Sequence, residues 1–294
     1  MVNSLDEHGR TPLHCLAAAA AGAKCPTQVE ADAHALIENG VNVNKQDKDG
    51  NTALHLSIFH LRMSLSKILL QHKDIDVTIA NQKEKTPLHV AAEIDDFLVL
   101  EHLLKVSNAS KAFNMTDVHN FTPLVVSIRN SSQVNFAHRL LAAGADPNYQ
   151  GDNVYDHFDH DNIHLDRTAL HYAAQLGLNE HVKMLVEFGA NVNAHDMRRR
   201  SPLHYAVENT KMPTICLLVS LGGDFGIHDE DDQTALTLAR RNGFAEAVEF
   251  FESEANRHRE NRYKKKRRGG GKDEIAKKRR RSSTDTGYKS GSPI

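Results

Sequence analysis

A short phrase that begins with threonine or serine recurs seven times along the 294-residue chain. In its fullest form it reads Thr-Pro-Leu-His, as at residues 11–14, and a small pair such as Ala91-Ala92 follows soon after. The intervals between the seven phrases are 41, 34, 36, 46, 33 and 33 residues. A period of this size indicates stacked supersecondary units, none of which buries its apolar face alone. A repeat stack is therefore the expected fold.

The landmarks of each unit have physical roles. The Thr or Ser caps a first helix by accepting bonds from its free N–H groups, and Pro suits the first helical position. A Leu-Leu pair about ten residues on marks a second helix, and a glycine such as Gly144 or Gly189 supplies the left-handed conformation that ends it. The sequence predicts an all-α solenoid over residues 1–253, with β-hairpin or turn fingers. The repeats start near residues 6, 47, 81, 117, 163, 196 and 229, with inserts at 17–27 and 149–163.

The composition limits the classes of function. The chain has no Trp and three scattered cysteines, Cys15, Cys25 and Cys216, which we interpret as small buried hydrophobic residues in a reducing compartment. No apolar run reaches the length of a membrane span, and the polar N-terminus does not resemble a secretory signal. Neither a Gly-x-Ser-x-Gly nucleophile motif nor a phosphate-binding glycine loop is present. We expect no enzyme activity and no cofactor.

Nineteen histidines invite a metal hypothesis. Five of them share one slot of the repeat, which predicts hydrogen bonds to neighbouring backbone: His14, His55, His89, His171 and His204. A second group, in the Asp- and His-rich stretch 156–164, is a weak candidate for zinc: His157, His160 and His164. That stretch lacks cysteine and a helical template, which favours a solvated surface loop.

Two fingers near the end of the stack carry opposite charges. Their residues are candidates for partner binding: Arg198, Arg199 and Arg200 in one finger, and Glu230, Asp231 and Asp232 in the next. A cationic tip suits an acidic partner, and the contrast between neighbouring fingers favours selective docking. The competing interpretation is a pair of solvated turns.

The charge of the chain is divided between a body and a tail. Residues 1–256 carry a balance of −13 and residues 257–281 a balance of +11. Few apolar groups and self-repulsion predict a disordered basic tail over residues 254–294. Two basic clusters predict a two-part nuclear import signal that an import receptor binds: Lys264, Lys265, Lys266, Arg267 and Arg268, then Lys277, Lys278, Arg279, Arg280 and Arg281. Direct nucleic-acid contact is less favoured, and a merely solvated tail is the third alternative. Ser282 and Ser283 are candidate phosphorylation sites whose added charge would weaken receptor binding.

These features resemble the intracellular ankyrin domain of Notch-type receptors, in particular the nematode branch, over roughly residues 6–268. The resemblance rests on the long first unit, on the insert before the phrase Arg167 to Gln175, and on the basic clusters after the last repeat. It implies a nuclear stack that joins a CSL-type DNA-binding transcription factor and a Mastermind-like coactivator. The chain departs from the family in lacking the Trp-containing segment that tethers such domains. The alternative is a cytoplasmic adaptor or inhibitor that sequesters a protein partner.

Overall fold

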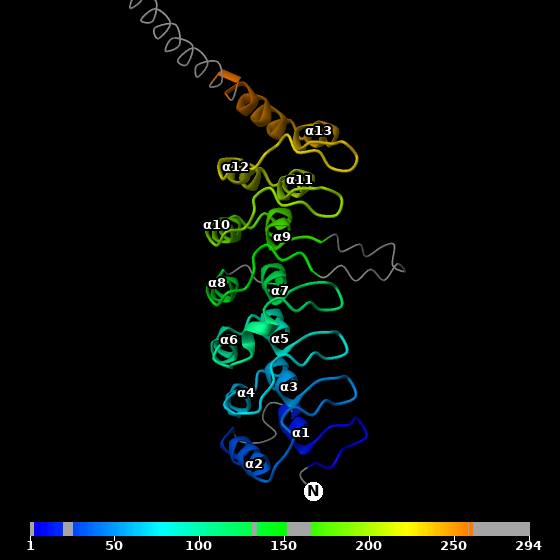
Figure 1. Cartoon of the computed structure of the whole chain (residues 1–294), viewed down its shortest axis with the longest axis vertical. Coiled ribbons are helices and arrows are strands. Elements are labelled where there is room, and N and C mark those ends of the chain that lie inside the picture. The colour runs from blue at the N-terminus through cyan, green and yellow to red at the C-terminus, as the bar shows by residue number, and fades with distance from the viewer. Residues whose placement is uncertain (1–2, 20–25, 131–133, 152–165, 258, 261–294) are drawn as a thin grey trace, which may run out of the picture. The chain divides into compact units, whose positions relative to one another are not determined.

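The computed structural model describes residues 3–19, 26–130, 134–151, 166–257 and 259–260, and the described residues are helices and turns with no strand. The chain divides into two compact units, residues 1–238 and 239–294. In the first unit, helices come in pairs, one pair per repeat (Figure 1). The first helices of the pairs are α1 (Pro12–Ala18), α3 (Ala53–Phe59), α5 (Pro87–Glu93), α7 (Pro123–Asn130), α9 (Ala169–Leu176) and α11 (Pro202–Glu208). The second helices are α2 (Pro26–Glu38), α4 (Met63–Leu70), α6 (Phe97–Leu103), α8 (Asn135–Ala142), α10 (Asn179–Glu187) and α12 (Met212–Ser220).

The first helices pack against one another in chain order, from α1 through α3, α5, α7 and α9 to α11. The second helices form a parallel row to one side of them (Figure 1). Leucines of the recurring phrase, among them Leu54 and Leu170, are fully buried between neighbouring units. Small residues such as Ala91 and Ala173 are equally buried and let adjacent helices approach closely. The core is therefore continuous from repeat to repeat, as the period predicts.

The helix ends follow the predicted chemistry. The Thr or Ser of the phrase is the N-cap of its helix, and at five positions a capping box forms with the histidine three residues later. Pro occupies the first turn of α1, α5 and α11. Gly144 and Gly189 have φ of 105° and 88° directly after second helices, as the C-cap argument requires.

Two features of the repeats differ from the expected layout. Helix α1 continues to Ala18 and α2 starts at Pro26, so the first insert is shorter than 17–27. The third repeat contains an unforeseen 3₁₀ turn, η1 (Ala109–Ala112), which accounts for extra length before the fourth phrase. Of the second insert, 149–163, only residues 149–151 are among the described residues, and they have no regular secondary structure.

The second unit begins inside helix α13 (Ala235–Arg241), and residues 245–257 form another helix. Phe251 and Ala247 are buried, and Arg240 pairs with Glu252 at 2.6 Å across the turn between the two helices. The expected boundary between stack and tail, at 253/254, lies within this helix. The helix continues because Glu254 is itself buried and pairs with Arg257 at 2.8 Å.

Candidate protein-interaction surface

The fingers are turns held by an acidic or amide side chain at their first position. The Oδ1 atom of Asp47 accepts bonds from the backbone N–H groups of Asp49 and Asn51, at 3.0 and 2.8 Å. Four other fingers are closed in the same way, by Asp6, Asn81, Asp117 and Asp229. This side-chain mimic of a backbone turn fixes each finger without a β-ladder. The predicted fingers are thus turns and not β-hairpins in the described part of the chain.

Adjacent fingers are also joined to each other by backbone hydrogen bonds. Lys48 N–H donates to the His8 carbonyl at 2.9 Å, and Glu230 N–H donates to the Arg198 carbonyl at 2.9 Å. In the same way Gln82 N–H donates to the Asp49 carbonyl, and Val118 N–H donates to the Lys83 carbonyl. The fingers therefore form a linked row beside the first helices (Figure 1), so a partner meets a surface that spans several repeats.

The repeat histidines hold this row to the helices. Nδ1 of His55 accepts from the Thr52 N–H at 3.2 Å, and its Nε2 donates to the Lys85 carbonyl of the next finger at 3.0 Å. The other four make the same bridge: His14, His89, His171 and His204. The predicted structural role of these histidines is confirmed. Burial lowers the pKa of His55 to about 4, so the neutral ring that this pattern requires is the form present at neutral pH.

The structure pairs the two charged fingers with each other. Arg198 lies 3.4 Å from Glu230, and both side chains are about half exposed. Arg199 is exposed and has a φ of +58°, at the finger position that Gly9 and Gly50 occupy in the first two repeats. Asp231 and Asp232 are also exposed. These residues form one mixed-charge surface across two repeats instead of two independent tips.

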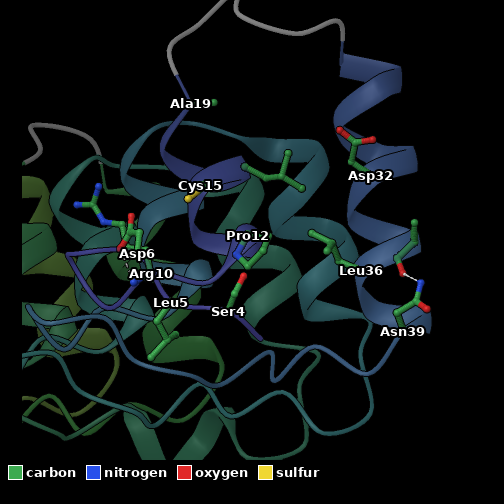
Figure 2. A pocket seen from close by; sticks show the side chains of 12 residues that line it. Ser4, Leu5, Asp6, Arg10, Pro12, Cys15, Ala19, Asp32, Leu36 and Asn39 are labelled. Carbon is green, nitrogen blue, oxygen red and sulfur yellow. Dashed lines mark hydrogen bonds between the residues drawn. The ribbon is translucent and has the colours of Figure 1, made fainter. Parts of the chain in front are cut away.

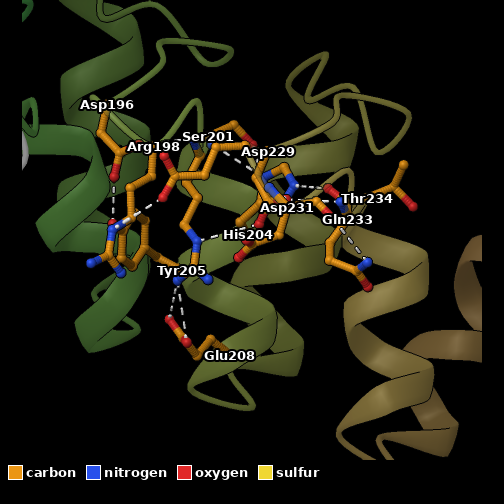
Figure 3. Close-up of polar contacts among 12 residues, drawn as sticks. Asp196, Arg198, Ser201, His204, Tyr205, Glu208, Asp229, Asp231, Gln233 and Thr234 are labelled. Atoms are coloured by element: carbon orange, nitrogen blue, oxygen red, sulfur yellow. Dashed lines mark hydrogen bonds and ion pairs between the residues drawn. The ribbon is translucent and has the colours of Figure 1, made fainter.

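Arg200 does not lie at a finger tip. Its side chain is 12% exposed and pairs with Glu208 at 3.2 Å and with the buried Asp229 at 3.4 Å (Figure 3). Burial is the largest single influence on Arg200 and lowers its pKa. The nearby carboxylates outweigh burial together and hold the pKa above its usual value. The interpretation of Arg200 as part of a projecting tip is wrong, because the residue before the capping Ser turns back toward the helix.

The same inward-facing position recurs in other repeats, and the recurring Thr-Pro-Leu-His phrase does not predict it. The residue before the capping Thr or Ser contacts the residue eight positions later on the first helix of its own repeat. The contacts are Lys85 to Glu93 at 2.8 Å, Phe121 to Arg129 at 4.2 Å, Arg167 to Gln175 at 3.4 Å and Arg200 to Glu208 at 3.2 Å. We name this row of paired positions the contact strip. Its sequence signal is the chemistry of two fixed repeat positions, one beside the cap and one at the end of the helix.

In repeats four to six, arginine and aromatic side chains alternate along the contact strip. Arg129 lies over the rings of Phe121 and Tyr172, at 4.2 and 5.6 Å from their centroids. Arg167 lies 5.8 Å from the Tyr172 ring and 4.2 Å from the Tyr205 ring, which Arg200 approaches at 6.0 Å. We call these six residues the arginine ladder. Cation–π contacts of this kind orient a guanidinium group without using its N–H donors.

The ladder is anchored by a buried carboxylate. The Tyr205 hydroxyl donates to Oδ2 of Asp196 at 2.5 Å, and Oδ1 of Asp196 accepts from the Arg200 N–H at 2.8 Å (Figure 3). Arg167 Nε lies 4.0 Å from Asp196 Oδ2. Burial, followed by the bond to Asp196, raises the pKa of Tyr205. The ring and its two arginine neighbours are therefore fixed by both repeats that meet there.

A separate hollow of about 710 Å³ lies beside α1 and α2 (Figure 2). Leu5, Leu36 and Cys15 are among its lining residues, and Leu5 is 52% exposed. Cys15 is exposed and Cys216 is partly exposed, so the interpretation of the cysteines as buried residues is wrong for these two. Cys15 occupies the repeat slot of Tyr172 and Tyr205, which are buried by the arginines on either side.

The remaining predicted sites lie outside the described residues. These are the metal candidates His157, His160 and His164, both basic clusters of the tail, and the candidate phosphorylation sites Ser282 and Ser283. The described part of the chain contains no cluster of three or more His, Cys, Asp or Glu that could hold a metal ion. It also contains no helix long and apolar enough to cross a membrane.

Comparison with known proteins identifies the repeat. A family model described as ankyrin repeats (3 copies) matches residues 62–151 and 153–226, and one described as ankyrin repeats (many copies) matches residues 16–70. The ankyrin repeat domain of Bcl-3 superposes with a TM-score of 0.68 at 22% identity, covering 84% of this chain and 100% of that one. The human ASB11 ankyrin repeat domain superposes with a TM-score of 0.59 at 23% identity, covering 78% of this chain and 92% of that one. At these identities the solved structures show the fold alone.

Full-length relatives were also matched. Protein glp-1 of Caenorhabditis elegans is 34% identical over 262 residues, which are 88% of this chain and 20% of that protein. Protein lin-12 of the same nematode is 34% identical over 194 residues, 65% of this chain and 13% of its own length. Human neurogenic locus notch homolog protein 1 is 28% identical over 207 residues, which are 68% of this chain and 8% of that protein. The predicted resemblance is confirmed, and the chain spans a fifth or less of the length of these relatives.

Proposed function

Because the chain belongs to the ankyrin-repeat family and is a protein-interaction scaffold, we propose that it works in the nucleus, where it joins a CSL-type transcription factor and a coactivator to regulate transcription. The observation that carries the proposal is the match to glp-1 over 88% of the chain, together with the notch homologue among the relatives. The linked row of fingers and the contact strip beside it offer the long surface that two simultaneous partners need.

The basic tail supplies the second part of the proposal. Two cationic clusters separated by eight residues suit an import receptor whose grooves are acidic. The body has the opposite charge, with a balance of −13 over residues 1–256. This division favours a tail that directs location and a body that binds partners. Direct nucleic-acid binding is not part of the proposal.

The first experiment tests location. A fluorescent reporter fused to residues 254–294 is expected to accumulate in the nucleus, and the same fusion with Lys277 to Arg281 changed to glutamine is expected to remain distributed through the cell. Exclusion of the unchanged fusion from the nucleus would contradict the nuclear proposal and favour the cytoplasmic adaptor. The glutamine variant controls for passive entry of a small fusion protein.

The second experiment tests the partners. Full-length chain, immobilised on beads, is mixed with a purified CSL-type transcription factor, with and without a Mastermind-like coactivator. We expect capture of the transcription factor, and of the coactivator only when the transcription factor is present. Absence of capture under both conditions would contradict the Notch-like role of this chain, but not its role as a protein-interaction scaffold.

A further inference from the structure

We propose that the arginine ladder of repeats four to six binds an acidic peptide segment of a partner protein in extended conformation. The inference deepens the proposed function: it rests on the scaffold role and names the chemistry of one bound segment. It does not depend on nuclear entry or on which transcription factor is present.

The central residue is Arg129, at the end of α7. Its side chain is exposed, while the Phe121 ring beneath it is only 8% exposed. Among the described residues its guanidinium contacts the faces of Phe121 and Tyr172 and makes no ion pair. Stacking on a ring fixes the plane of the group and leaves its N–H edges to solvent. That geometry suits a bidentate bond to a carboxylate.

The other two arginines extend the site along the contact strip. Arg167 and Arg200 are partly exposed, at 19% and 12% of their side chains, and each already neutralises a buried carboxylate. They therefore contribute positive electrostatic potential to the site but few free N–H donors. Arg129 therefore provides the main direct contact, and Arg167 and Arg200 favour negative charge further along the peptide.

The spacing of the ladder predicts the form of the peptide. Successive guanidinium groups share a ring between them, so they lie at most about 12 Å apart. Packed helices are spaced by about 8–10 Å. Three residues of an extended chain in polyproline II conformation make one turn and cover about 9 Å, so every third side chain lies on the same side. An acidic residue at every third position thus meets one arginine per repeat.

A nucleic acid fits the same surface less well. The rings of Phe121, Tyr172 and Tyr205 are 8%, 6% and 2% exposed, so none offers a free face on which a base could stack. The body around the ladder is acidic overall and repels a continuous polyanion. A short peptide with separate carboxylates avoids both difficulties.

The test is a binding titration with the full chain and a dye-labelled peptide of Ser and Gly with Glu at every third position. Since the basic tail also attracts anions, the decisive comparison is between two variants that each lose one charge. Arg129→Gln removes the exposed ladder arginine. Lys67→Gln is the matched control, because Lys67 is exposed on α4, in the other row of helices.

We expect Arg129→Gln to weaken binding about tenfold, as loss of one charge-assisted bidentate contact does, and Lys67→Gln to change it less than twofold. A peptide of the same composition with its Glu residues grouped at one end should bind the unchanged chain more weakly. Equal affinities for the two variants, or no binding by the unchanged chain, would overturn the proposal. Tighter binding of a single-stranded oligonucleotide, with the same dependence on Arg129, would reassign the ladder to nucleic acid. None of these outcomes alters the test of nuclear entry.

Discussion

His171 joins two repeats, because its Nε2 donates to the backbone carbonyl of Arg200 in the following finger at 3.0 Å. Its Nδ1 accepts from the Thr168 N–H at 3.1 Å in its own repeat. The ring is fully buried and also makes an edge contact with Tyr205, 5.7 Å between centroids. One side chain thus closes the start of a helix and positions the base of the arginine ladder.

The first prediction concerns this bridge. His171→Ala removes both bonds and leaves a buried N–H and a buried carbonyl without their partner, so the free energy of unfolding should fall by about 2–4 kcal/mol. Urea unfolding followed by circular dichroism measures it. His34 is exposed on α2, and His34→Ala should stay within about 0.5 kcal/mol of the unchanged chain. Equal effects of the two changes would contradict the bridging role.

The second prediction is an acid-sensitive stack. Burial lowers the pKa of His55, His89 and His171 to about 4, against about 6.5 when the chain is unfolded. The unfolded state therefore binds more protons between these values, and their contribution to stability is complete above pH 6.5 and is lost as the pH falls toward 4. Each histidine contributes a slope of up to about 1.4 kcal/mol per pH unit in that window.

Urea midpoints between pH 7.5 and 4.5 measure this dependence. His171→Gln, which has no titrating ring, should reduce the slope by about one third of the three-histidine total. A midpoint that stays constant from pH 7.5 to 5 would show that the buried rings titrate normally.

How far the sequence predicts this structure depends on the range of each interaction. The capping phrase acts within four residues, so Thr52 and His55 could be assigned to their helix and to backbone bonds from the pattern alone. The carbonyl that receives the His55 bond belongs to Lys85, thirty residues away. That partner follows only from the register in which one repeat stacks on the next.

The same reason explains the errors at the candidate site. Arg198 and Glu230 lie in successive repeats, and they were treated as separate fingers because their pairing is set by helix packing and not by local sequence. Cys15 was expected to be buried as a small hydrophobic residue. The same slot is buried in the later repeats, for example at Leu56, Val90 and Leu238, so the exposure of Cys15 is set by what packs around the first repeat and not by the residue type.

The third prediction tests the shared core. Leu170 is fully buried between units, and Leu170→Ala should leave a cavity that costs about 2–5 kcal/mol of unfolding free energy. Lys48 is exposed on a finger, and Lys48→Ala should change stability by less than about 0.5 kcal/mol. Thermal unfolding of both variants provides the comparison. A small loss for Leu170→Ala would mean that the repeats do not depend on one another for their interior.

The fourth prediction concerns regulation of the tail. A double change, Ser282→Asp with Ser283→Asp, places negative charge directly after the second basic cluster and should slow nuclear entry of the reporter fusion. Ser282→Ala with Ser283→Ala is the matched control and should enter at the unchanged rate. Time-lapse imaging after photobleaching of the nucleus measures the rates. Equal rates for the two double variants would remove phosphorylation as a control of import.

The last prediction uses the strained finger position. Arg199 has a φ of +58°, a conformation that costs a residue with a side chain about 1–2 kcal/mol and glycine almost nothing. Glycine also loses about 0.5–1 kcal/mol more backbone entropy on folding, which offsets part of the gain. Arg199→Gly should therefore stabilise the chain by about 0.5–1 kcal/mol in urea unfolding. The adjacent Arg198 has no positive φ and pairs with Glu230, so Arg198→Gly should destabilise. Opposite signs for neighbouring arginines would show that backbone conformation decides the effect, whereas destabilisation by both would mean that the Arg199 side chain contributes contacts worth more than its strain.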